Sequence, residues 1–493
     1  MENKNSFKYF VFKEHRWLLY GAIVVLIIHF VLIKLLYPHA ISDIDSRYYV
    51  RAADLAINVD MRPIGYSLFL RWIHFFTHKD IAVVIIQFIL LECAILYFYF
   101  SLLYLLRTGK FIRYLILFGL IMNPMILCIN NYVMSDGLFA ALTVWWFTLM
   151  LWFCCCPKPS QVYAMAMLLI CLFAIRYNSM FYPVISATVV LFSKIGWRVK
   201  LAGLALGCLL FWGFIRYTTS QYYKLTGQRD FSPFSGWQLA ANALLMYRHL
   251  PDRKADIPPS YLQPLHQLVL HHLDTAATPD SIPDYILRNY FMWDIRSPLQ
   301  HYLYMRCPNM DFNSFPSDGG IQTLRGWVSM GKLYREYGAW LIKKHPLAYG
   351  QYYISQGLEW FVDSKAEFSN TFDQGGFVVT DRIKRWFGYS SQWVHSTTFK
   401  GYTFIVFPFI IGLLNLLLIL GTTGFYYCRC HTIVSPIFNW AIALNAVFWL
   451  MNFVFLVTLA PMTLRYALPI LILNLGFVPV LSERIYHVTV TTQ

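Results

Sequence analysis

Apolar runs of about twenty residues recur along this chain, and they limit its fold more than any other feature does. A helix of about 20 residues crosses the hydrocarbon core of a bilayer, and inside lipid its backbone groups must be satisfied within the segment. Of the 493 residues, 58% are hydrophobic and only 13% are charged, whereas about a quarter are charged in a typical soluble domain. We therefore expect an all-α polytopic membrane protein.

The hydropathy pattern predicts about ten transmembrane helices. The predicted spans are residues 17–37, 81–106, 111–130, 137–156, 161–175, 179–193, 199–217, 402–427, 436–460 and 464–481. The chain then divides into an N-terminal transmembrane module (1–217), an insertion (218–401) and C-terminal transmembrane helices (402–493). The insertion has helical apolar spacing in several stretches, so we expect it to be mostly helical. These stretches are 260–273, 283–293, 321–336 and 346–362.

The net charge of +15 is concentrated in short loops that alternate with less basic ones. This is the distribution that the positive-inside rule describes, and it argues against nucleic acid as a partner. It predicts that both termini are cytoplasmic and that residues 38–80 and 218–401 lie outside. The sequence has no Asn-x-Ser/Thr acceptor, which favours a bacterial inner membrane with a periplasmic insertion.

The first outer loop contains an apolar stretch, residues 64–76, that is too short to cross a membrane. Residues 46–58 and 64–76 have the pattern of amphipathic helices that lie on a membrane surface. The Arg62-Pro63 turn separates them, because the residue before a proline avoids helical backbone. We therefore expect surface helices within residues 46–76.

Two acids, Asp43 and Asp45, directly follow the first predicted span. Carboxylates at a membrane boundary are costly, so a pair of them there usually has a function. One interpretation is a general base that removes a proton from an acceptor hydroxyl. A second is that Asp43 and Asp45 bind a divalent cation that screens a phosphate. A third is an N-cap for the surface helix that begins near Ser46.

A longer pattern around Asp45 resembles the first outer loop of the GT-C glycosyltransferases. It continues from Tyr49 through Ala52-Ala53 to Arg62-Pro63-x-Gly65-Tyr66-x-Leu68-Phe69-Leu70. That family consists of multispanning enzymes that use polyprenyl-phosphate sugars, including protein O-mannosyltransferases and lipid A aminoarabinose transferases. Its catalytic aspartate follows the first span, and by register it corresponds to Asp45 better than to Asp43. This chain differs in having Arg62-Pro63-Ile64-Gly65 in place of the family's Pro-Pro-Gly and Ser67 where proline is common.

Two later segments resemble the same family. Ser135-Asp136-Gly137-Leu138-Phe139 is similar to the Ser-Glu/Asp-x-Leu-Phe motif that opens the fourth span, and Arg465-Tyr466-Ala467-Leu468-Pro469 is similar to a late Arg-Tyr-x-x-Pro motif. The resemblance implies that Asp136 is a second acid facing the cavity of Asp45, for acceptor or metal contact. A helix cap is the alternative interpretation of Asp136. The resemblance also implies substrate-binding roles for the motif tyrosines, Tyr49, Tyr66 and Tyr466.

Three arginines at the predicted outer face are candidates for holding a lipid phosphate: Arg465, Arg176 and Arg62. A guanidinium presents a fork of N–H donors that matches phosphate oxygens. The alternative is that these side chains extend to lipid headgroups. Glu92 and His29 lie in the middle of predicted spans, where we favour a structural pair or a protonated Glu92 over catalysis.

The resemblance implies a glycosyltransferase that moves a sugar from a polyprenyl-phosphate-linked donor to an extracytoplasmic acceptor, which is a lipid, a glycan or a protein. Membrane lipid is a further expected partner, and a divalent cation is the only cofactor considered. Two alternatives stay open. One is a lipid-linked oligosaccharide flippase or exporter, and the other is a surface-polysaccharide ligase or polymerase with lipid-diphosphate donors. The absence of a Walker A motif argues against an ATP-driven pump.

Overall fold

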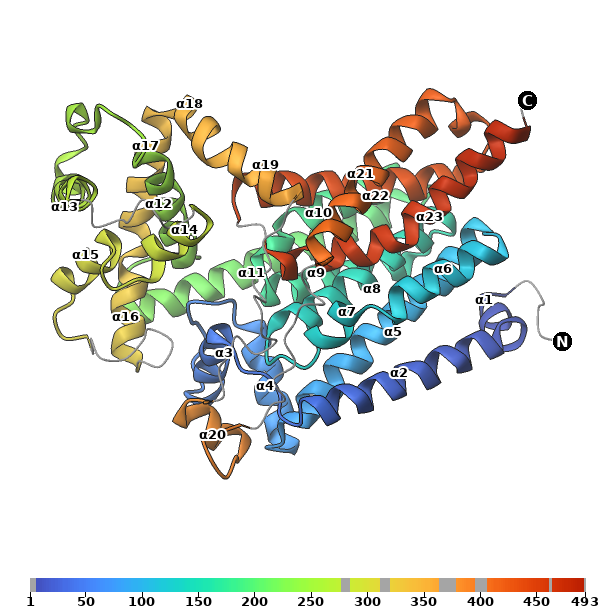
Figure 1. Ribbon diagram of the computed structural model, residues 1–493, viewed down its shortest axis with the longest axis horizontal. Coiled ribbons are helices and arrows are strands. Elements are labelled where there is room, and N and C mark those ends of the chain that lie inside the picture. Colours follow the sequence, from blue (N-terminus) through green and yellow to red (C-terminus); the bar gives the residue numbers. More distant parts are fainter. Residues whose placement is uncertain are drawn as a thin grey trace.

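Helices form almost all of the regular structure in the computed structural model (Figure 1). The structure describes residues 6–275, 284–310, 320–362, 378–394, 406–460 and 463–491. Within these ranges there is no β-sheet, and two isolated bridges are the only strand-like pairings. The prediction of an all-α fold is therefore confirmed for the part of the chain that is described.

Eight long apolar helices, counted over the described ranges, make this a multi-pass integral membrane protein. Six are single helices: α2 (Arg16–Leu36), α5 (Asp80–Leu106), α8 (Ser135–Cys155), α11 (Trp197–Thr226), α21 (Val406–Tyr427) and α22 (Pro436–Thr458). Two are composite: α6 (Lys110–Ile121) with α7 (Pro124–Ile129), and η8 (Leu464–Ala467) with α23 (Leu468–Thr491).

Two of the ten predicted spans are shorter than the others. They correspond to α9 (Pro159–Ile175) and to η2 (Tyr177–Phe181) with α10 (Tyr182–Phe192). Arg176 has an extended backbone that ends α9 and separates it from η2. The ten predicted spans thus correspond to eight long helices and two shorter apolar ones in the described ranges, and the two shorter ones lie at the predicted positions, 161–175 and 179–193.

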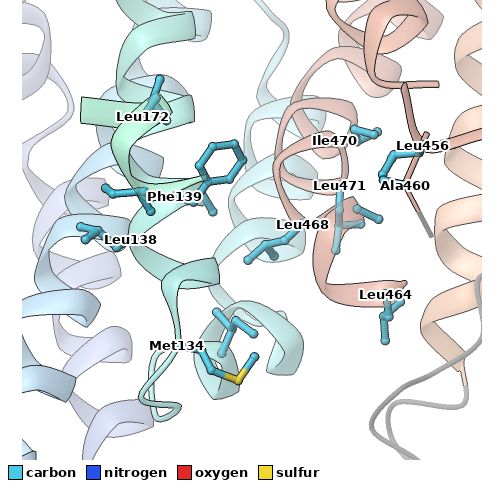
Figure 2. Packing of buried hydrophobic residues seen from close by; sticks show 14 of the residues in the cluster. Met134, Leu138, Phe139, Leu172, Leu456, Ala460, Leu464, Leu468, Ile470 and Leu471 are labelled. Atoms are coloured by element: carbon cyan, nitrogen blue, oxygen red, sulfur yellow. The ribbon is translucent and has the colours of Figure 1, made fainter. Parts of the chain in front are cut away.

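The membrane helices pack around α8 and α23, and most of α23 is buried. Both chain ends lie at one end of this bundle, and the helices α12 to α17 lie beyond the other end (Figure 1). Figure 2 shows buried apolar side chains near the starts of α8 and α23, including Leu138, Phe139 and Leu468. These starts flank the candidate site described below.

The two predicted surface helices are present as α3 (Ile44–Asp54) and α4 (Gly65–Phe76). One face of α4 buries Tyr66, Leu70 and Ile73. The opposite face exposes Leu68, Trp72, Phe75 and Phe76, as expected for a helix that lies in the membrane interface. Helix α20 (Asp381–Phe387) packs on this pair, with Trp386 stacked on His74 at 3.7 Å between ring centroids.

The described parts of the insertion are helical, as predicted. They comprise α12 (Pro233–Tyr247), η3 (Arg253–Ala255), η4 (Ser260–Leu262), α13 (Gln263–Asp274), α14 (Asp284–Trp293), α15 (Pro298–Arg306), α16 (Ile321–Ser329), α17 (Gly331–Lys344), α18 (Pro346–Tyr349), η5 (Gly350–Ile354) and α19 (Ser355–Val362). Helix α11 continues past residue 217, so one helix connects the bundle to the insertion (Figure 1).

Glu92 does not form the expected pair with His29. Glu92 is 4% exposed, and neither of its carboxyl oxygens has a hydrogen-bond partner among the described residues. The buried Nδ1 of His29 also lacks a partner there. The two residues therefore do not hold α2 and α5 together.

Candidate functional site

Asp43 is the N-cap of α3, so of the two acids it is Asp43 that caps the helix. Its backbone is extended, and its Oδ1 accepts a hydrogen bond of 2.6 Å from the Ile44 N–H. The Ser46 hydroxyl accepts in return from the Asp43 N–H at 2.9 Å, which completes a capping box. The carboxylate of Asp43 thus fixes the start of the helix that carries Asp45.

Asp45 lies in the first turn of α3 and is only 7% exposed. Arg62 donates to its Oδ1, and Arg465 donates to its Oδ2 at 2.8 Å. Burial alone would raise the pKa of Asp45, but Arg62 and then Arg465 outweigh it and hold that pKa well below its usual range. Asp45 is therefore an ionised carboxylate with both oxygens engaged.

Asp136 is the second buried acid, in the first turn of α8 and 3% exposed. Arg176 donates to its Oδ1, and Nη1 of Arg465 lies 3.5 Å from its Oδ2. The N-cap of α8 is Met134, and no side chain caps this helix. The contacts of Asp136 with the two arginines therefore differ from those of a capping residue.

Arg465 contacts both acids and so joins residues from α3, the start of α8 and the start of the last span. The arginine–aspartate cluster consists of Asp45, Asp136, Arg62, Arg176 and Arg465. Three guanidinium groups face two carboxylates, which leaves one positive charge in excess. Five of the nine predicted site residues are thus brought together in one cluster, and Asp43 is not among them.

The three motif tyrosines surround the cluster. The Tyr49 hydroxyl lies 2.8 Å from the Ser135 hydroxyl, next to Asp136. Burial raises the pKa of Tyr49 to about 12, so its hydroxyl stays protonated near neutral pH. The guanidinium of Arg176 lies 4.3 Å from the centre of the Tyr466 ring, a cation–π contact.

A hydrogen bond to α5 holds Tyr66 in place. Its hydroxyl donates to Oε1 of Gln87 at 2.5 Å, and the Gln87 amide donates to the carbonyls of Asn130 and Tyr132 at 3.0 Å each. Its ring packs edge-to-face on Tyr49 with 4.8 Å between centroids. Tyr66 therefore supports the first-loop helices against the loop that precedes α8.

A buried ion pair that sequence reasoning missed positions Arg62. Arg51 and Asp60 are 0% and 2% exposed, and Nε of Arg51 donates to Oδ2 of Asp60 at 3.0 Å. Asp60 also accepts from the Met61 N–H at 2.6 Å, and its carbonyl accepts from Tyr222 at 2.7 Å. These bonds fix the loop immediately before Arg62.

Phe234 of α12 also contacts the cluster, since the guanidinium of Arg62 lies 4.6 Å from the centre of its ring. Phe234 belongs to the insertion, so a residue outside the membrane bundle borders the site. In the sequence, the only feature of Phe234 is its position next to Pro233 at the start of a helix. This feature does not distinguish it as a site residue. The insertion thus covers one side of the cluster.

The donor set at the cluster does not fit a divalent cation. Both oxygens of Asp45 contact guanidinium groups, and the carboxylate of Asp43 is engaged in helix capping. The described ranges contain no group of three or more His, Cys, Asp or Glu side chains that could bind a metal ion. The excess positive charge of the three arginines also disfavours a cation at this position.

Comparisons of the chain with protein families, with curated proteins and with solved structures gave no match. The proposed function therefore rests on the residues of the cluster and their arrangement. The resemblance of the three motifs to the GT-C glycosyltransferases stays a prediction.

Proposed function

We propose that the protein is a membrane glycosyltransferase of the GT-C type, which moves a sugar from a polyprenyl-phosphate carrier to an extracytoplasmic lipid, glycan or protein. The observation that carries this proposal is the contact of Arg465 with both Asp45 and Asp136. It unites the residues of three separate motifs in one cluster. We place the protein in a bacterial inner membrane, with both termini in the cytoplasm and the insertion in the periplasm.

Asp45 serves as the general base in this proposal. Its carboxylate takes the proton of an acceptor hydroxyl while that oxygen forms a bond to the anomeric carbon. The bond between the anomeric carbon and the phosphate oxygen breaks, and the electron pair leaves with the polyprenyl phosphate. Atoms and charge balance without a cofactor.

The arginines bind the donor phosphate and also adjust the base. While Arg62 and Arg465 contact Asp45, they keep the pKa of its carboxyl low, and the carboxylate is then a weak base. When these guanidinium groups turn to the phosphate of the donor, the pKa of Asp45 rises and the carboxylate becomes a better proton acceptor. Donor binding thus prepares Asp45 for the acceptor.

Charge favours a monophosphate donor over a diphosphate donor. A sugar linked through one phosphodiester carries a single negative charge, which matches the single excess positive charge of the cluster. A diphosphate linkage carries two and leaves one uncompensated in a partly buried site, which is costly. The exposed apolar face of α4 supports a position at the membrane surface, where such a phosphate lies.

A transfer assay on the purified full-length protein tests the proposal. The donors are radiolabelled polyprenyl-monophosphate and polyprenyl-diphosphate sugars, added to a membrane extract that supplies acceptors. We expect labelled product from the monophosphate donor, and Asp45→Asn abolishes it. Asp43→Asn is the matched control, because asparagine caps a helix as well as aspartate does, so this variant keeps transfer.

Two results would contradict the proposal. Full transfer by Asp45→Asn removes the assigned base, and product from the diphosphate donor alone indicates a ligase or polymerase. A flippase would give no covalent product, yet would move the labelled carrier across the bilayer of a reconstituted vesicle. The same labelled donors therefore separate the three functions.

A further inference from the structure

A cavity lies in the insertion, where α11 ends. Its volume is about 490 Å³, within the range of small-molecule sites. It is lined by the loop after α11, by α15 and by the start of α17, and it shares no lining residue with the arginine–aspartate cluster. The polar and charged residues that matter here are Gln228, Arg229, Tyr302, Arg306, Lys332 and Glu336.

The cations of this cavity have no acidic partners among the described residues. Arg229, Arg306 and Lys332 are exposed, and the described residues offer none of them an ion pair. Two other cations of α17 differ, because Arg335 pairs with Asp230 and Lys344 pairs with Asp256.

The one acid among the described lining residues is Glu336, and it raises the pKa of the nearby Tyr261 hydroxyl. Among the described residues, three cations and one acid therefore line the cavity, an excess of positive charge.

We propose that this cavity binds an anionic sugar through its phosphate or carboxylate group. The three cations attract the anionic group, and the hydroxyl of Tyr302 with the amide of Gln228 suits the sugar hydroxyls. The further identification of this sugar as part of the acceptor rests on the proposed function. The binding of an anionic sugar does not.

The position of the cavity fits recognition of an acceptor at a point away from the reaction. Helix α17 contributes Lys332 and Glu336 to the cavity, while Gly331 and Gly338 pack against α12. Helix α12 in turn places Phe234 on Arg62. The α12–α17 layer therefore separates the two sites, and an extended acceptor would have to contact both.

Calorimetric titration of the full-length protein in detergent tests this proposal. The probes are glucose 6-phosphate and glucuronic acid, with glucose as the neutral control. We expect at least one anionic sugar to bind at low salt and more weakly at high salt, and glucose not to bind. The two anionic probes distinguish a phosphate site from a carboxylate site.

Variants that change the charge of the cavity in opposite directions make the test specific. The double variant Arg306→Glu/Lys332→Glu is expected to weaken binding at least tenfold, and Glu336→Gln to strengthen it severalfold. Lys254→Glu reverses a cation of the same domain that is 79% exposed and outside the cavity, so it serves as the control. Equal binding of glucose, or unchanged binding in both cavity variants, would overturn the proposal.

The outcome is independent of the proposed transferase activity. Asp45→Asn is expected to bind the anionic sugar as the unchanged protein does, because it leaves the cavity intact. Sugar binding without any transfer by the unchanged protein would reject the proposed function and keep the anion site. Transfer without sugar binding would reject the anion site and keep the proposed function.

Discussion

The buried charges in and beside the arginine–aspartate cluster occur in pairs or larger groups. Breaking such a pair by removing one partner leaves the other charge buried and uncompensated, which is far more costly than losing an exposed pair. The Arg51–Asp60 pair is the most completely buried of these pairs. Because it precedes Arg62, its loss affects both stability and the position of a cluster residue.

Arg51→Ala is expected to lower the free energy of unfolding by about 3–5 kcal/mol, because it leaves Asp60 without its partner. Thermal denaturation of the purified protein in detergent measures this change. Arg296→Ala is the control, since Arg296 pairs with Asp294 but its side chain is 75% exposed. Equal melting temperatures for the two variants would show that the Arg51–Asp60 pair has no special weight.

Residue types and motif positions were enough to predict the members of the cluster but not their contacts. Asp45, Asp136 and Arg465 were each selected as outer-face residues, and all three meet. Their contact joins positions 420 residues apart, and no local pattern encodes such a pairing. Asp60 was missed for the same reason, because its meaning depends on Arg51 and Tyr222 being its neighbours.

Among the elements, the closest packing in the insertion depends on glycines. A Cβ added to Gly236 of α12 would lie 1.8 Å from the carbonyl oxygen of Gly331 in α17. Trp237 and Trp327 stack beside this contact with 4.9 Å between ring centroids. The two helices can therefore approach this closely only without a side chain at position 236.

Gly236→Ala is expected to lower the free energy of unfolding by about 1–3 kcal/mol or more, because the backbones of α12 and α17 must separate. Tryptophan fluorescence during thermal unfolding reports the change through the stacked pair. Gly213→Ala in α11 meets no atom within 4 Å, and its higher helix propensity adds up to about 1 kcal/mol. Destabilisation by the second variant and not the first would refute the packing argument.

The ends of α12 and α17 are also connected by Asp256, which gives the insertion a pH dependence. Tyr247, Lys344 and His345 donate to its carboxylate at 2.9, 2.8 and 2.7 Å. Burial alone would raise the pKa of Asp256, but the hydrogen bonds from Lys344, His345 and Tyr247 lower it below its usual value.

Because the folded state has the lower pKa, Asp256 contributes stability above the unfolded value of about 4, and this contribution is lost as the pH falls through the folded value. Melting temperatures measured from pH 6 to pH 3 should decrease less steeply in Asp256→Asn than in the unchanged protein. Parallel decreases would exclude this role for Asp256.

Helix existence was easier to predict than helix length. Hydropathy identified α9 and α10 and the break between them, where Arg176 has an extended backbone. Hydropathy also placed the end of the seventh span at residue 217, whereas α11 continues to Thr226. The added turns are polar, so they carry no hydropathy signal, although their residues continue the helix.

For the molecule as a whole, the two chain ends lie at the same end of the bundle, and α12 to α17 lie beyond the other end (Figure 1). Alkaline phosphatase is active only outside the cytoplasm, so fusions of it report the side of each loop. We expect activity for fusions after residues 40 and 260, and none after residue 109. The positive-inside pattern is the physical reason. A cytoplasmic position for residue 40 would put Asp45 on the wrong side for the proposed donor and would refute the proposed function.

The contact between Arg465 and Asp45 also has a consequence for biosynthesis. A ribosome translates codon 45 long before codon 465, since 420 positions separate them. During that interval the nascent chain holds both acids in the membrane without the cation that connects them. A prematurely terminated product that lacks the last helix would insert its early segments but never assemble the cluster.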